Sequence, residues 1–220
     1  MKKVLLTILA GMFMIGSAYA QPSFTVGIGF NKGVFAAEGR EENFNESGTL
    51  KSVTEEYGAF EDSYASIYVE VGNEVGSIGL AYQDDVATPT NVNETNADDG
   101  GSSTATSTVS ADFSGVITLY GLVNLPLNTY LKAGIVQGDI AINETQRSGN
   151  TYKDQDLEGY VLGFGYQYEA AEANVRVELL GHTYDDVETN NGVATTGNHN
   201  KVRISNMIGA NAQISVNRSF

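Results

Sequence analysis

The feature that most constrains this chain is a repeated alternation of apolar residues with small or polar ones. Successive side chains on a β-strand point to opposite faces of the sheet, so a segment with this period has one apolar face. Eight segments of the chain show it, at residues 24–30, 64–72, 77–83, 109–123, 130–142, 160–168, 175–180 and 202–219. No segment shows a sustained helical period of apolar residues. The sequence therefore predicts an all-β fold.

Three of these segments make specific predictions about which residues share a face. In the fourth we expect one apolar face that holds Val109, Ala111, Phe113, Ile117, Leu119 and Val123. In the fifth the apolar residues change parity after Ile135, and we interpret this change as a β-bulge near Gln137 and Gly138. In the last segment Val202, Ile204 and Ile208 share the face of Ile214 and Val216, and Arg203 lies on the opposite face.

The connections between the segments alternate in length. They are short after the second, fourth and sixth segments, and long at residues 37–63, 84–108, 143–156 and 183–200. Outer-membrane barrels show this rhythm, because their periplasmic turns are short and their outer loops are long. We therefore predict an eight-stranded antiparallel up-and-down transmembrane β-barrel with short periplasmic turns and long outer loops.

The N-terminal residues 1–20 are interpreted as a secretory signal peptide. Lys2 and Lys3 precede an apolar run, and Ala18-Tyr19-Ala20 predicts cleavage between Ala20 and Gln21. The apolar run is shorter than the roughly 20 residues that a membrane-spanning helix needs, which favours a cleaved signal. An uncleaved membrane anchor is the alternative. Residues 21–220 contain no Pro/Ser linker, so we expect them to form a single barrel domain.

Composition excludes several classes of function. Removal of the signal, which carries two lysines and no acidic residue, changes the formal net charge from −15 to −17. Such a surface repels nucleic acid, which proteins bind mainly through Lys and Arg. The chain has no cysteine, which excludes disulfides, a thiol nucleophile and a cysteine zinc site. The acidic pairs match no ordered calcium-loop spacing, so we expect no metal site and no cofactor, with weak divalent bridging to lipopolysaccharide as the alternative.

A family resemblance rests on the lysine-led signal, the strands GYVLGFGYQY (159–168), YLKAGI (130–135) and VRVEL (175–179), and the terminal Phe220. With these features the mature chain resembles the OmpA/OmpX-like and opacity-type outer-membrane barrels. The resemblance implies a location in the outer membrane of a Gram-negative cell. It also implies recognition of the last strand by the barrel-assembly machinery. Phe220, Val216, Ile214 and Ala212 match that signal, and Arg218 departs from it.

Five charged residues are predicted to point into the barrel: Glu70, Lys132, Arg176, Glu178 and Arg203. A narrow eight-stranded barrel is filled by its own side chains, so charges inside it must pair. We expect a locked ionic network. The alternative is a gated water path or a small pore, for which nearby inward glycines and serines leave some room.

An enzymatic interpretation requires a nucleophile with a base. His182 and His199 are predicted near the outer rim, with Ser205, Asp185 and Glu188 nearby in the sequence. A Ser-His-acid site there would resemble the outer-membrane lipid A deacylases. His182 lies in GHTYDD and has no serine at a matching short spacing, so we expect no enzyme.

Three functions are consistent with these features. The first is a monomeric barrel that anchors acidic loops outside the cell for membrane integrity, adhesion or recognition. Its partners would be membrane lipid, lipopolysaccharide, the assembly machinery and an extracellular ligand. The second is a narrow porin-like channel for water, ions or small solutes. The third is a soluble secreted β-sandwich, which would bury the apolar faces against a second sheet.

Overall fold

The computed structural model describes residues 22–45, 47–88, 91–96, 105–144, 152–170, 172–192 and 199–220. In 91–96, 105–109 and 144 it describes the backbone alone. The predicted signal peptide and its cleavage site at Ala20 and Gln21 lie outside these residues. No helix in this part of the chain is long and apolar enough to cross a membrane.

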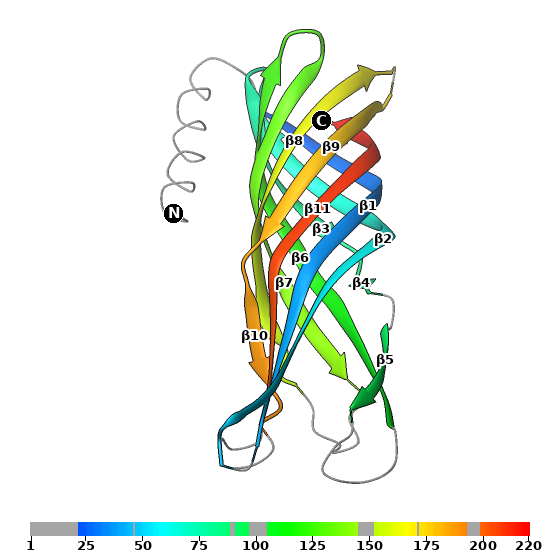
Figure 1. The fold of residues 1–220 in the computed structure, drawn as a ribbon. Coiled ribbons are helices and arrows are strands. Elements are labelled where there is room, and N and C mark those ends of the chain that lie inside the picture. The colour runs from blue at the N-terminus through cyan, green and yellow to red at the C-terminus, as the bar shows by residue number, and fades with distance from the viewer. Residues whose placement is uncertain are drawn as a thin grey trace.

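The structure is a single antiparallel sheet that closes on itself (Figure 1). Its strands are β1 (Ser23–Phe44), β2 (Leu50–Gly72), β3 (Gly76–Gln83), β4 (Val86–Ala87), β5 (Asn91–Asn96), β6 (Ala105–Leu125), β7 (Thr129–Glu144), β8 (Gln155–Glu169), β9 (Asn174–Tyr184), β10 (Val187–Asn190) and β11 (Asn200–Ser219). The ring runs β1-β2-β3-β6-β7-β8-β9-β11, and β1 pairs with β11 to close it. The short strands β4 and β5 pair with β6, and β10 pairs with β11. The eight-stranded up-and-down barrel predicted from the sequence is confirmed.

The two ends of the barrel differ. At the upper end in Figure 1, here called the short-turn end, brief connections join β2 to β3, β6 to β7 and β8 to β9, and the C-terminus lies there. At the opposite end, here called the long-loop end, β1 and β2 project as a hairpin, and β5 and β10 lie at the same end. Leu127 and Asn128 make the β6–β7 turn possible by adopting positive φ angles of 65° and 57°.

The apolar faces of the strands point outward. On β1 the inward Thr25 and Asn31 are buried, whereas Val26, Ile28 and Phe30 are 42%, 65% and 59% exposed. The same outward face on the other strands carries Ile67, Leu80, Ile117, Leu131, Leu162, Leu179 and Ile214. This is the reverse of a soluble sandwich, which buries its apolar faces, and it is the surface that a barrel presents to lipid. We call these outward residues the apolar belt.

The wall continues well beyond the apolar belt. Lys32 and Glu61 face outward just past Phe30 and form an exposed ion pair of 3.5 Å. The predicted loop at residues 37–63 is therefore wrong: β1 continues to Phe44, and β2 begins at Leu50. Charged and polar residues on both faces of this segment hide the alternation, while backbone hydrogen bonds still pair the two strands residue by residue.

The bulge predicted in the fifth segment lies in the facing strand. In β7 every second residue from Tyr130 to Ile142 points inward without interruption. The register shift is in β6, between Ser114 and Ile117, where Gly115 has a φ angle of 60°. It turns Ala111 and Phe113 toward the interior core, so the single apolar face predicted for β6 is wrong. The parity change in β7 reflects an interior that becomes apolar toward the long-loop end.

A second irregularity changes the faces of β11. The register between β1 and β11 shifts between Ala36 and Glu38, beside Asn206, whose φ angle is 53°. Beyond it Ile204 packs against the interior core, while Arg203 is exposed. The predicted placement of Arg203 inside the barrel and of Ile204 outside it is therefore wrong.

Candidate functional site: the barrel interior

Two ion pairs lie inside the barrel near its short-turn end. Arg176 Nη1 on β9 is 2.7 Å from Glu70 Oε1 on β2, and Lys132 Nζ on β7 is 3.2 Å from Glu178 Oε2 on β9. All four side chains are buried. The structure therefore brings together four of the five charged residues that the sequence placed in the interior. Arg203 is not among them, because it pairs with Asp186 on the outer surface.

Tyrosines complete this network. The hydroxyl of Tyr120 donates a hydrogen bond to Glu70 (2.9 Å), and the hydroxyl of Tyr130 donates one to Glu178 (2.9 Å). The Lys132 ammonium lies 4.2 Å from the centre of the Tyr120 ring. Each buried carboxylate thus has both a cation and a phenol, which offsets the cost of removing its charge from water. We call Glu70, Tyr120, Tyr130, Lys132, Arg176 and Glu178 the ionic plug.

Glycines make the space for the tyrosine rings to cross the interior. A Cβ atom added at Gly165 would lie 2.2 Å from Cζ of Tyr130, and one at Gly79 would lie 2.4 Å from Cζ of Tyr120. The inward glycines that seemed to leave room for a water path are therefore covered by rings. These tyrosines are not among the site residues predicted from the sequence, although the repeated Gly-aromatic pattern was the available sign of them.

A group of neutral polar side chains lies next to the ionic plug. Asn211 Nδ2 donates to Asn31 Oδ1 (2.9 Å), and Asn31 Nδ2 donates to Ser66 Oγ (3.1 Å). Lys132 and Gln213 line a cavity of about 30 Å³ here. A volume of this size holds about one water molecule.

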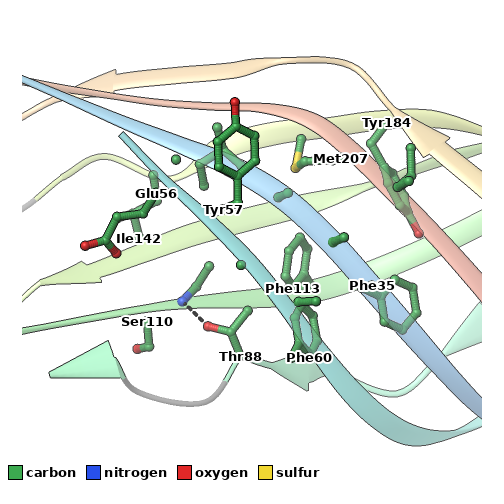
Figure 2. Close-up of a pocket in the computed structure, with 18 of the residues that line it drawn as sticks. Phe35, Glu56, Tyr57, Phe60, Thr88, Ser110, Phe113, Ile142, Tyr184 and Met207 are labelled. Atoms are coloured by element: carbon green, nitrogen blue, oxygen red, sulfur yellow. Dashed lines mark hydrogen bonds between the residues drawn. The ribbon is translucent and has the colours of Figure 1, made fainter. Parts of the chain in front are cut away.

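Toward the long-loop end the interior becomes apolar and opens into a larger cavity of about 330 Å³. Its aromatic residues lie in series: the rings of Phe35 and Phe60 stack with centroids 5.4 Å apart, and those of Phe60 and Phe113 stack at 6.5 Å. Figure 2 shows these three rings, which come from β1, β2 and β6, together with Tyr184 and Met207, which also line the cavity. This cavity was not predicted from the sequence, because Phe60 was expected in a loop and Phe113 on the outer face.

His182 on β9 is partly buried among amide and aromatic side chains. Its Nε2 lies 2.6 Å from Oδ1 of Asn211, and its Nδ1 has no hydrogen-bond partner. Its ring lies against Phe35 and Tyr184, with centroids 6.4 Å and 6.0 Å away. Among the residues that the structure describes, neither ring nitrogen meets a serine or a carboxylate.

The other candidate residues lie apart from the interior. His199 packs against Phe44, and Glu188 forms an ion pair of 2.7 Å with Lys201. Within the described ranges, no three His, Cys, Asp or Glu side chains are grouped to hold a metal ion. The residues of the predicted assembly signal are exposed on the outward face of β11 and just after it: Ala212, Ile214, Val216 and Phe220. The Arg218 guanidinium lies 5.4 Å from the centre of the Phe220 ring.

Solved structures share this architecture. The outer membrane protein OprG from Pseudomonas aeruginosa is similar with a TM-score of 0.60 and 12% identity, over 91% of this chain and 97% of OprG. The chain has the fold of a small outer-membrane β-barrel. No protein-family model matches this barrel, and no curated protein matches it in sequence.

Two further likenesses are weaker. The outer membrane protease OmpT from Escherichia coli has a TM-score of 0.45 and 10% identity, over 89% of this chain and 97% of OmpT. Neisserial surface protein A has a TM-score of 0.36 and 8% identity, over 86% of this chain and 97% of its own. At these scores neither likeness bears on the activity of the barrel.

Proposed function

We propose that the protein is an OmpA/OmpX-like barrel of the outer membrane that is closed to ions and has a structural and surface role. The observation that carries this proposal is the ionic plug, whose charged groups are buried and paired across the interior. An ion that crossed the barrel would have to displace buried tyrosine rings and separate buried ion pairs. Such separation leaves an uncompensated charge and is strongly unfavourable.

Planar-bilayer conductance tests whether the barrel is closed. The wild-type protein is expected to give no reproducible steps. The double variant Tyr120→Ala, Tyr130→Ala removes the two rings that lie over Gly79 and Gly165, so it is expected to conduct. A heat-modifiable band on gels checks that both proteins are folded. Steps from the wild-type protein would instead favour the narrow channel.

The surface role rests on the part of β1 and β2 that projects past the apolar belt. Residues 38–62 contain eight acidic and two basic residues, so this hairpin is a charged, solvated extension. We propose that it contacts an extracellular ligand or lipopolysaccharide, and that Phe220 and the outward face of β11 are recognised by the assembly machinery. We propose no catalytic role, because His182 has neither partner that hydrolysis by a triad requires.

A shortened hairpin tests the surface role. Asn43 pairs with Ser52, so residues 44–51 can be replaced by Asn-Gly, which favours a two-residue hairpin turn. Cells that express this variant are expected to lose adhesion to cultured epithelial cells, at equal surface expression. Increased detergent sensitivity with unchanged adhesion would instead indicate a role in membrane integrity, and no change in either would remove the hairpin from the function.

A further inference from the structure

The cavity toward the long-loop end has the properties of a binding site for a small molecule. Its volume of about 330 Å³ falls at the lower end of the roughly 300–1,000 Å³ that is common for ligand pockets. Strands from around the ring contribute apolar side chains to it: Phe35, Phe60, Phe113, Ile142, Leu157 and Met207. Side chains of this kind supply most of the lining of pockets that bury an apolar ligand.

The barrel wall beside this cavity has an unpaired stretch. From Ser66 to Gly72, β2 pairs with both β1 and β3, but among the described residues its part from Leu50 to Tyr64 pairs with β1 alone. Across this stretch, β4 pairs only with β6. Residues of both flanks line the cavity, with Phe60 on one side and Val86 on the other. Among the described residues, no strand pairing therefore joins these two flanks of the cavity.

The charges around the cavity select the sign of the ligand. Glu41 and Glu56 are among the lining residues. Arg40 lines it too, but its guanidinium is engaged by Glu42 at 2.9 Å and by Glu55 at 2.6 Å. The surplus of carboxylates on this hairpin gives the entrance a negative potential. Such a potential attracts cations and repels anions.

We propose that this cavity binds a small apolar cation, with an aromatic or aliphatic body and an ammonium group. The body occupies the apolar interior, and the ammonium group lies between the rings and the carboxylates of the entrance. Aromatic faces attract ammonium groups, and Phe35, Phe60 and Phe113 present three rings in series. This function is separate from the surface role and does not require ions to cross the barrel.

Titration calorimetry on the protein in zwitterionic-lipid nanodiscs tests the proposal. The probes are 4-phenylbutyl-trimethylammonium and 4-phenylbutane-sulfonate, which share one apolar body and differ in the sign of charge, and protein-free nanodiscs supply the background. The cation is expected to bind at least tenfold more tightly than the anion. Equal binding of the two, or no binding of the cation above background, overturns the proposal.

Variants locate the binding. Ala111→Phe fills the cavity and is expected to weaken cation binding at least tenfold, and Ala37→Phe makes the same change from β1. The matched control is Ala65→Phe, because Ala65 is exposed on the outward face of β2. Glu56→Gln is expected to weaken binding severalfold at low salt, whereas Glu74→Gln at the short-turn end is not. Unchanged binding in a folded Ala111→Phe or Ala37→Phe variant overturns the proposal.

Discussion

At the residue scale, the interior shows how little freedom a charged side chain has inside a narrow barrel. Lys132 donates to both carboxylate oxygens of Glu178, and Tyr130 donates to the same group. The surface pair of Lys32 and Glu61 has the same chemistry, but its side chains are 64% and 67% exposed. A comparison of the two pairs therefore separates the effect of burial on stability from the effect of charge.

Removal of one partner from each pair tests this difference. Glu178→Ala leaves Lys132 and the Tyr130 hydroxyl buried without their acceptor, and we expect it to lower the free energy of unfolding by about 3–5 kcal/mol. Glu61→Ala removes an exposed partner and is expected to cost about 0–1 kcal/mol. Urea unfolding in lipid vesicles measures both. Equal losses would show that the plug contributes no more than a surface pair.

Inward glycines are expected to be as sensitive as the charges. A methyl group at Gly165 would overlap the Tyr130 ring, so Gly165→Ala should destabilise the barrel by about 1–3 kcal/mol. Gly58 on the hairpin has nothing within 4 Å of an added Cβ, so Gly58→Ala serves as the matched control. The same unfolding measurement compares them, and a neutral Gly165→Ala would mean that the ring moves aside freely.

At the element scale, the strands were predictable where lipid demands an apolar face. The segment at 24–30 alternates because its outward residues meet hydrocarbon, and β1 was found there. Beyond Phe30 no such demand acts, so the continuation of β1 to Phe44 leaves no alternation in the sequence. Gly115 and Asn206 also escaped prediction, because a bulge depends on one backbone angle and the pattern on each side of it looks regular.

The bulge in β11 has a measurable electrostatic consequence on the outer surface. It places Arg203 against Asp186, and the hydrogen bond from Arg203 lowers the pKa of that carboxyl below its ordinary value of 3.8. The contribution of this pair to stability is present above the unfolded pKa and is lost as the pH falls through the folded value. Carboxyl NMR titration of the wild type and of Arg203→Gln checks this, and the variant should restore the ordinary pKa.

At the scale of the whole molecule, the closed ring could be predicted from the alternating lengths of the connections. The change of the interior from charged to apolar along the barrel could not. The pairing of interior polar residues depends on how far each strand is shifted against the next. One extra residue in β11 moves Arg203 from the interior to the outer surface. The apolar belt and the exposed end of β11 were both expected, because they follow from period two alone. The cavity depends on the register of strands from all around the ring at once.

Assembly of the whole barrel is expected to depend on the side chain of Phe220. Phe220 is 71% exposed, so truncation of its side chain removes no packed contact from the interior and keeps its two backbone hydrogen bonds with Phe24. Phe220→Ala should reduce the heat-modifiable fraction in cell membranes severalfold, while refolding in detergent stays unchanged. Leu127→Ala, which truncates another highly exposed apolar residue at the same end, should leave both unchanged. Equal assembly of the Phe220→Ala variant in cells would mean that the machinery recognises other residues.

The unpaired stretch of β2 also sets how its amides exchange with deuterium. In an antiparallel strand, successive N–H groups point alternately to the two neighbours, so a strand with one neighbour protects only every second amide. Between Leu50 and Tyr64 we expect fast and slow exchange to alternate, while the facing part of β1, which has β2 and β11 on its two sides, exchanges slowly throughout. Uniform protection on β2 would mean that another segment covers its edge. If the alternation is observed, this part of the wall can widen and narrow at little cost, because no backbone hydrogen bonds have to break there.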